Sequence, residues 1–292
     1  MGEPLHIGVL GPLTLIVENT SAAPSAPKLR SVLTTVALHP RKVVPVSTLM
    51  GELWDVEPPN SAVTTLQTYV LNLRKVLAAS MHRPLTEIAQ EVLVTRAGGY
   101  MLVVEDDALD YQRYNAMVAA GRDLIAGGDD RGGVALLDEA LRMWRGPALV
   151  DVQGSWLLES RRLQLEESRL VVLEYLMDAQ LRLGMYREAL PELVALTGTN
   201  PLHEGLHARY MRALHLSGRR AQALKVFQEL RGNLVRELGL EPGKPLQRLH
   251  QAILSADDAL EDAPGTDDFL HTGAFELERD LSAVGLSRRH GQ

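Results

Sequence analysis

The first hundred residues alternate between strand-like and helix-like patterns of apolar positions. Residues 5–17 are rich in Ile, Val and Leu and are interrupted by glycine and proline, which predicts short strands joined by a turn. A stretch rich in Ser, Ala and Pro, residues 19–27, predicts a loop. Apolar positions at helical spacing then predict a helix over residues 28–39, which Pro40 ends. We therefore expect the chain to begin with a small sheet and a helix.

Two more helices are predicted before residue 80. Ser47 is expected to cap a short helix, and Pro58-Pro59 breaks the chain after it. A longer helix is expected to begin at a cap formed by Asn60 or Ser61 and to end near Ala79. Its apolar residues recur at spacings of three and four, which places them on one face toward a core. They are Val63, Leu66, Val70, Leu73 and Leu77.

The outer side of the longer helix carries small polar groups and cations. They are Thr64, Thr65, Thr68, Asn72, Arg74 and Lys75. Residues 91–105 then predict a β-hairpin, because two Val-rich segments flank a turn that contains Arg96 and Gly98-Gly99. Strands, three helices and a hairpin in this order are typical of a winged helix-turn-helix with an N-terminal sheet. We predict this α+β fold for residues 1–105.

Such a helix and hairpin are suited to DNA. A helix that exposes Thr, Asn, Arg and Lys can enter the major groove, where side chains read base edges and contact phosphates. An arginine at a hairpin tip can enter the minor groove, where the electrostatic potential is negative. The periodicity alone leaves open a second interpretation, in which Arg74, Lys75 and Arg96 are ordinary solvated charges.

The region from residue 106 to residue 255 has helical periodicity with Gly or Pro at the breaks. Two segments within it repeat a pattern of small and large apolar residues, and their leading glycines, Gly184 and Gly218, are 34 residues apart. That period is typical of tetratricopeptide repeats, whose stacked helix pairs bind other proteins. We predict an all-α, tetratricopeptide-like domain, with a generic helical bundle as the alternative.

The distribution of charge removes an apparent objection to DNA binding. The chain of 292 residues has a net charge of −7, whereas DNA-binding domains usually present a basic face. Residues 1–105 contain 8 basic and 8 acidic residues, and residues 106–255 contain 19 and 20. Residues 256–292 contain 3 and 9, so most of the acidity lies in a tail that we expect to be solvated and disordered. A locally cationic helix and hairpin are compatible with an acidic chain.

Several classes of protein are disfavoured. With 0 cysteines, the chain has no disulfide scaffold, no thiol nucleophile and no Cys-ligated metal. It has no apolar run long enough to span a membrane and no secretory signal, so we expect a cytoplasmic protein that associates with the nucleoid. No phosphate-binding or nucleotide-binding glycine motif occurs. We therefore expect no enzyme, no catalytic residues and no cofactor.

One motif formally resembles a zinc-protease site. His203-Glu204-Gly205-Leu206-His207 has the H-E-x-x-H spacing that would place two histidines on one face of a helix. We set it aside and expect no metal, because Asn200-Pro201 places the motif at a helix start and Gly205 weakens a helix that must hold ligands rigidly. Trp144 and Trp156 are interpreted as core residues rather than as a ligand cage.

Several ordered motifs resemble one known family. Those of the first half are Leu49-Met50-Gly51-Glu52-Leu53-Trp54, Pro58-Pro59-Asn60-Ser61-Ala62, Leu73-Arg74-Lys75-Val76-Leu77 and Val94-Thr95-Arg96-Ala97-Gly98-Gly99-Tyr100. Those of the second half are Trp144-Arg145-Gly146-Pro147-Ala148-Leu149 and Glu237-Leu238-Gly239-Leu240-Glu241-Pro242-Gly243. Together they resemble the Streptomyces antibiotic regulatory protein family, in which an OmpR-type winged helix precedes a bacterial transcriptional activator domain.

The resemblance implies a transcription activator of a biosynthetic gene cluster. Members of this family are similar in binding direct repeats near promoters, side by side as a dimer on DNA, and in recruiting RNA polymerase. By position, the DNA-binding residues are Thr64, Thr65, Thr68, Asn72, Arg74, Lys75 and Arg96. The pair Leu71-Asn72 departs from the family, which often has a basic residue beside the second position. The alternative is an interaction scaffold whose winged helix binds protein.

Overall fold

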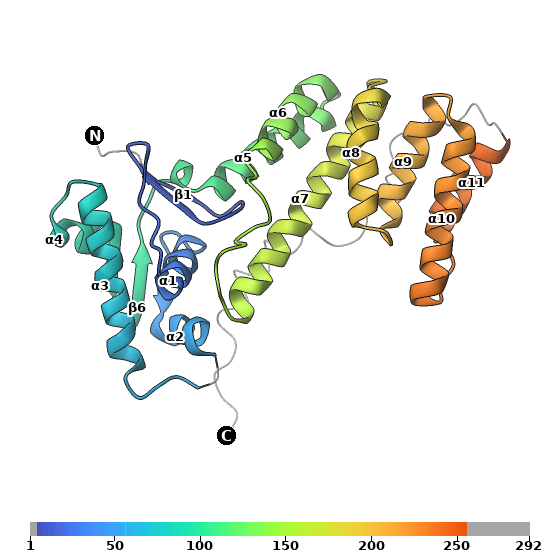
Figure 1. Ribbon diagram of the computed structural model, residues 1–292. Coiled ribbons are helices and arrows are strands. Elements are labelled where there is room, and N and C mark those ends of the chain that lie inside the picture. Colours follow the sequence, from blue (N-terminus) through green and yellow to red (C-terminus); the bar gives the residue numbers. More distant parts are fainter. Residues whose placement is uncertain (1–4, 56, 256–292) are drawn as a thin grey trace. The chain divides into compact units, whose positions relative to one another are not determined.

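The computed structural model describes residues 5–55 and 57–255 (Figure 1). They form two compact units. The first comprises the described residues up to Ala120 together with Asp138–Arg169, and the second comprises Gly121–Leu137 together with the described residues from Leu170 onward. The expected domain boundary between residues 105 and 106 stays a prediction, and the predicted acidic tail, residues 256–292, lies outside the described residues.

The first sheet confirms the strands predicted over residues 5–17. It has three antiparallel strands in the order β1-β2-β3, with Leu5 paired to Val17. The strands are β1 (Leu5–Gly8), β2 (Thr14–Val17) and β3 (Thr20–Ser21). The short strand β3 lies where only a loop was expected. Side chains such as Ile7 and Leu15 are buried, because alternate residues of a strand point to the same face.

Three helices follow, close to their predicted positions. They are α1 (Pro27–Ala37), α2 (Val46–Trp54) and α3 (Ala62–Ser80). Ser61 is the N-cap of α3, although its side chain makes no capping hydrogen bond. The prediction that Ser47 caps α2 is wrong, because the N-cap is Pro45. The chain passes directly from the short strand β4 (Val44–Pro45) into the helix, and Ser47 is already helical.

The buried face of α3 differs from the prediction at its first position. Leu66, Val70, Leu73 and Leu77 are buried as expected. Val63 is 47% exposed, and Ala62 is buried in its place. The buried positions therefore step by four, four, three and four residues. Val63 lies only about 20° around the helix from Val70, so its exposure reflects its place in the first turn of α3. Its assignment to the core was wrong.

The second sheet contains the predicted hairpin. Its strands have the order β4-β6-β5 and are antiparallel. The hairpin strands are β5 (Leu93–Arg96) and β6 (Gly99–Leu102). They and the turn Ala97-Gly98 form what we call the wing. Two short helices that the sequence analysis did not predict precede it, α4 (Leu85–Glu87) and the π-helix η1 (Ile88–Val92).

The wing turn requires its glycines. Gly98 has a φ of +81°, in the left-handed region that favours glycine. A Cβ on Gly99 would lie 2.1 Å from the carbonyl oxygen of Val44, so no larger residue fits between β6 and β4 at this point. These two constraints fix the position of Arg96, which comes just before the turn.

The rest of the described chain is mainly helical. A short 3₁₀ helix, η2, spans Asp106–Ala108. The α-helices that follow are α5 (Asp110–Ala126), α6 (Asp130–Arg142), α7 (Trp156–Arg182), α8 (Tyr186–Thr199), α9 (Glu204–Leu216), α10 (Arg220–Leu238) and α11 (Lys244–Ser255). None of the helices that the structure describes is long and apolar enough to cross a membrane.

The repeat seen in the sequence corresponds to paired helices. Figure 1 shows α8, α9 and α10 side by side, and α9 packs against both neighbours. Gly184, before α8, and Gly218, before α10, have φ values of +74° and +79°, so glycine permits the same tight turn in each repeat. Ala189 and Ala223, five residues after these glycines, are fully buried and allow close approach of neighbouring helices.

Buried carboxylates fasten the winged helix to the chain that follows it. Glu52 on α2 is 5% exposed. Its carboxylate accepts hydrogen bonds from the backbone N–H groups of Ser155 at 3.0 Å and Leu157 at 3.1 Å, at the start of α7. The first N–H groups of a helix have no partner within that helix. Glu52 therefore acts as a cap for α7 from more than a hundred residues away.

Two aspartates in the chain that follows the winged helix accept hydrogen bonds from backbone N–H groups near its first strand. Asp110, at the start of α5, accepts from the N–H groups of Val9 at 2.8 Å and Leu10 at 3.1 Å. Asp151 accepts from the N–H group of Leu13 at 2.8 Å. Burial of the Asp110 carboxyl group raises its pKa despite these hydrogen bonds. The loop after β1 is thus held by residues that lie beyond the predicted winged-helix domain.

In the second unit, a buried ion cluster joins α7 to α9. The guanidinium of Arg209 is fully buried and forms two hydrogen bonds with Asp178, from Nη2 at 2.6 Å and from Nε at 3.0 Å. Its Nη1 donates to Glu174 at 3.0 Å and to the carbonyl of Gly205 at 3.1 Å. One cation therefore neutralises two buried carboxylates.

We expect Arg209→Ala to lower the free energy of unfolding by about 3–5 kcal/mol, because it leaves two buried carboxylates without their cation. Urea unfolding followed by circular dichroism measures the change. The matched control is Lys225→Ala, which removes an exposed pair with Glu229 and should change stability by less than about 1 kcal/mol. Equal effects of the two substitutions would contradict this account of the cluster.

We expect Glu52→Gln to lower stability by about 1–3 kcal/mol, because an amide group would replace one acceptor oxygen and face a backbone N–H. Thermal unfolding of the full chain measures the loss. Glu57→Gln, at an exposed position three residues beyond α2, is the control and should lie within about 0.5 kcal/mol of the wild type. A Glu52→Gln protein as stable as this control would show that the cap is dispensable.

Candidate DNA-binding surface

The outer face of α3 is the centre of the candidate site. Among the predicted DNA-binding residues, Thr64, Thr68 and Lys75 are exposed on this face. Thr65 and Asn72 are half-buried and lie at its margin. The structure thus brings three of the predicted residues onto one solvent-facing side and places the other two beside them.

Packing behind α3 keeps this face in place. Leu66, Val70 and Leu73 are buried toward the rest of the winged helix. The ring of Tyr69 on α3 stacks on that of Trp54 at the end of α2, with 6.3 Å between centroids and 19° between planes. This stack joins the two helices of the helix-turn-helix where the connecting loop begins.

Arg74 has a different environment from the one predicted for a base-reading residue. It is half-buried, and its Nε donates to the carbonyl of Leu93 at 2.9 Å. Its Nη2 donates to the hydroxyl oxygen of Thr95 at 2.7 Å. Burial lowers the pKa of the guanidinium. Strand β5 is at the edge of its sheet, so no further strand lies on its outer side to donate to the carbonyl of Leu93. Arg74 supplies this donor and thereby joins α3 to the wing.

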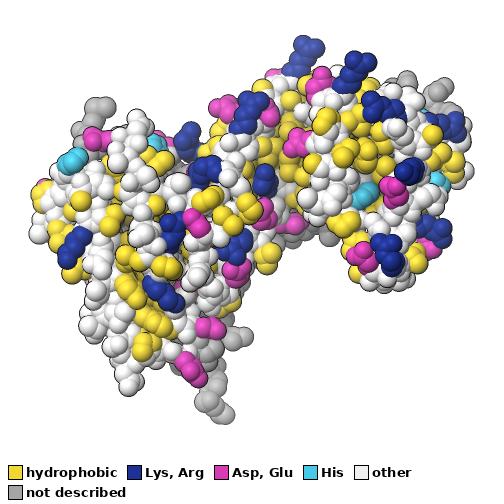
Figure 2. All heavy atoms as spheres, in the orientation of Figure 1, with side chains coloured by type: hydrophobic (Ala, Val, Ile, Leu, Met, Phe, Trp, Pro, Cys, Tyr) yellow, Lys and Arg dark blue, Asp and Glu magenta, His cyan; other side chains and the backbone are white. Residues whose placement is uncertain are grey.

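Lys75 and Arg96 are the predicted cations that remain available to a ligand. Both are exposed, and neither has an ion pair within the part of the chain that the structure describes. In contrast, Arg83 pairs with Glu87 at 3.1 Å and also with Glu91. On the face shown in Figure 2, Lys and Arg side chains are scattered among apolar and neutral ones, so no broad basic patch is visible there.

The hydroxyl of Thr68 has a partner within its own helix. It donates to the carbonyl oxygen of Thr64 at 3.0 Å, so toward a ligand it can accept but not donate. Thr64 has no such restriction in the described structure.

Two further residues on this face were not among the predicted DNA-binding residues. Gln67 is exposed between Thr64 and Leu71, and its amide can pair with the edge of adenine. Leu71 is 41% exposed at the centre of the same face. Their positions on the helical wheel, away from the buried residues, indicate that both are exposed. The prediction did not include them because it was based on cations, threonines and Asn72.

The H-E-x-x-H motif has a structural role. His203 is the N-cap of α9 and accepts from the N–H of Leu206, while Glu204 accepts from the N–H of Gly243 at 2.7 Å. His207 is buried, and burial lowers its pKa. Residues 5–55 and 57–255 contain no cluster of three side chains that could hold a metal ion.

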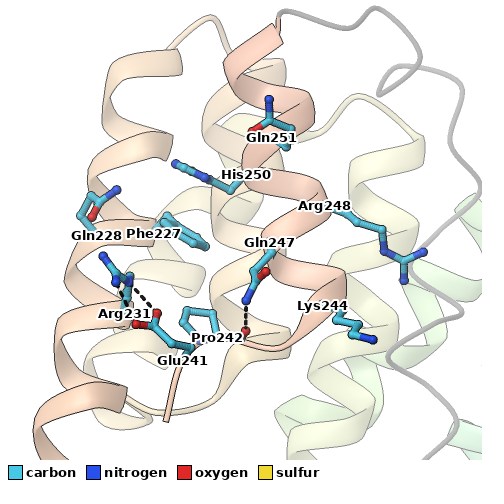
Figure 3. Close-up of a pocket in the computed structure, with 10 residues that line it drawn as sticks. All are labelled: Phe227, Gln228, Arg231, Glu241, Pro242, Lys244, Gln247, Arg248, His250 and Gln251. Carbon is cyan, nitrogen blue, oxygen red and sulfur yellow. Dashed lines mark hydrogen bonds and ion pairs between the residues drawn. The ribbon is translucent and has the colours of Figure 1, made fainter. Parts of the chain in front are cut away.

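A groove of about 880 Å³ lies between α10 and α11 (Figure 3). The ring of His250 stacks on Phe227, with 3.8 Å between centroids, and covers the apolar floor. Arg231 and Glu241 form a bidentate ion pair along one wall, at 2.6 Å and 2.8 Å. The groove therefore presents mainly charged and amide side chains, whereas small-molecule sites are mostly apolar.

The two tryptophans have opposite environments. Trp144 is buried and meets Tyr114 edge to face, as expected for a core residue. Trp156 is 74% exposed at the start of α7, so its interpretation as a core residue was wrong. The N-terminal position of Trp156 on the helix explains this, because the buried side of that turn is occupied by Leu158.

Two family descriptions match the chain in sequence order. Residues 22–102 match "Transcriptional regulatory protein, C terminal", and residues 109–254 match "Bacterial transcriptional activator domain". Regulatory protein DnrI of Streptomyces peucetius is 44% identical over 257 residues, which cover 88% of this chain and 94% of that protein. The chain belongs to the Streptomyces antibiotic regulatory protein family. It is thus a transcription regulator with an OmpR-type winged helix and a bacterial transcriptional activator domain, as its motifs predicted.

Other relatives agree with this assignment. Transcriptional regulator RedD of Streptomyces coelicolor is 32% identical over 260 residues, covering 89% of this chain and 73% of RedD. The structure of Mycobacterium tuberculosis EmbR in complex with a low-affinity phosphopeptide matches with a TM-score of 0.82 and 28% identity. That match covers 99% of this chain and 73% of EmbR. It confirms the predicted fold class, a winged helix followed by a tetratricopeptide-like helical domain.

We expect Arg74→Ala to release the wing from α3. Backbone hydrogen exchange at residues 93–96 should then rise roughly tenfold, since hydrogen bonds from a charged donor contribute about 1.5–3 kcal/mol. Hydrogen exchange read by mass spectrometry measures this change. Lys75→Ala is the control and should leave exchange in β5 unchanged. Unaltered exchange in Arg74→Ala would mean that the wing is held by its own sheet alone.

Proposed function

We propose that this family member activates transcription of a secondary-metabolite gene cluster by binding promoter DNA. In this proposal α3 enters the major groove and the wing places Arg96 in the minor groove. The observation that carries it is the connection made by Arg74, which fixes the exposed face of α3 and the cationic wing as one surface. Helix-turn-helix proteins read DNA with such a surface.

The predicted residues receive separate roles. Thr64, Thr65, Thr68 and Asn72 contact base edges, and an asparagine can pair bidentately with adenine. Lys75 contacts phosphate, and Arg96 responds to the narrow minor groove of A·T-rich DNA. Arg74 is a positioning residue that contacts the wing in the absence of DNA.

Family resemblance supports the wider arrangement. We infer that two copies bind direct repeats side by side, with repeat centres about 10–11 bp apart, one helical turn. The helical region then contacts RNA polymerase, because tetratricopeptide-like helices serve binding. The protein acts at the nucleoid, in the cytoplasm, and needs neither a cofactor nor catalytic residues.

The alternative, a scaffold whose winged helix binds protein, is favoured by the exposed apolar residues of α3 and by the few cations around them. The two functions differ in their response to salt. Binding to DNA releases counterions and weakens as salt rises, whereas an apolar protein contact changes little.

The test is a footprint on the promoter of a neighbouring biosynthetic operon, with affinities measured over a range of salt. We expect protection of repeated sites. Lys75→Ala should weaken binding to all sequences alike and reduce the salt slope by about one, and Arg96→Ala should weaken binding most on A·T-rich sites.

Arg83→Ala is the matched control, because Glu87 and Glu91 already engage this arginine, and it should leave affinity unchanged. No protected site together with a flat salt response would refute DNA binding and favour the scaffold.

A further inference from the structure

We propose that Leu71 reads thymine by contacting its C5-methyl group in the major groove. The inference rests on the proposed function, because it requires α3 to enter that groove. It adds an apolar element of sequence recognition to the polar residues already considered.

The exposure of Leu71 has no explanation within the protein. Leu71 is 41% exposed, although it lies on a helix whose opposite face supplies the core. At 100° per residue, Leu71 lies near the middle of the outer face of α3, roughly opposite the buried stripe. A large apolar side chain thus faces outward where the helix would meet DNA.

The major groove offers one apolar group to such side chains. Of the groups along base-pair edges there, the C5-methyl of thymine is the one that apolar residues contact, and the others are hydrogen-bond donors and acceptors. An exposed leucine at this position therefore favours thymine over cytosine at the bases nearest to it.

Gln67 completes the recognition of an A·T pair. It is four residues before Leu71, so the two side chains are neighbours on the helix, and it is exposed. Its side-chain amide can pair with N6 and N7 of adenine, while a neighbouring apolar side chain covers the methyl of thymine. The amide of Gln67 can therefore bind adenine while Leu71 contacts the methyl group of the thymine in the same base pair.

The experiment replaces thymine by uracil, which removes the methyl group and leaves base pairing intact. The full chain is used to select its preferred site from a library of random duplexes, and that site is resynthesised with deoxyuridine for thymidine. We expect the wild type to bind the uracil duplex about fourfold more weakly for each methyl group contacted.

A variant then tests whether Leu71 causes the effect. Leu71→Ala should bind the thymine and uracil duplexes within about twofold of each other, because it no longer contacts the methyl group. Because Leu71 is 41% exposed, the substitution should leave unfolding unchanged. Leu85→Ala, at an exposed apolar position on α4, is the matched control and should keep the full sensitivity.

Four results would overturn the inference: a selected site without thymine, equal wild-type affinity for the two duplexes, full uracil sensitivity in Leu71→Ala, or unchanged affinity of Leu71→Ala for the thymine duplex. In each of these cases DNA binding itself is intact and the proposed function stands; the last would assign Leu71 to a protein partner instead. If no duplex is enriched over random DNA, the proposed function fails and this inference fails with it.

Discussion

Backbone N–H groups that lack partners in their own element are the constraint on which the winged helix depends. Glu52 satisfies those at the start of α7, and Asp110 satisfies those of the loop after β1. An unpaired buried N–H group costs stability, so these carboxylates fix the elements that they join. The orientation of α2, and through it that of α3, therefore depends on residues beyond the winged helix. Helix α3 and the start of α7 therefore belong to one folded unit.

A second constraint acts within the winged helix, where the guanidinium of Arg74 forms hydrogen bonds inside the protein. A guanidinium held by Leu93 and Thr95 fixes the distance between α3 and β5. The same engagement leaves Lys75 and Arg96 as the exposed cations of this surface. A site with few cations gains less from phosphate contacts and must obtain more of its affinity from base contacts. The apolar side chains on α3 are consistent with that balance.

The elements could be predicted from the sequence where a periodic pattern decides them. Leu66, Val70 and Leu73 follow the helical period and are buried, and the hairpin of residues 93–102 follows from its Gly-containing turn. Val63 was misassigned because steps of three and four residues both fit a helix, and only the neighbouring elements decide between them. The contacts of Glu52 and Arg74 were out of reach, because their partners are distant in sequence and belong to elements whose packing no local pattern describes.

The acidity of the chain is compatible with DNA binding because electrostatic interactions are local. At physiological salt, the potential of a charge falls off over about 8 Å, so distant carboxylates do not cancel the field of Lys75 or Arg96. The net charge of −7 arises mainly from residues 256–292, whereas residues 1–105 contain equal numbers of basic and acidic residues. Because the exposed face of α3 is almost neutral, the proposed DNA binding would gain little from non-specific attraction to the DNA backbone. In that proposal, discrimination between sequences rests on base contacts, for which neutral side chains such as Gln67 and Leu71 are exposed.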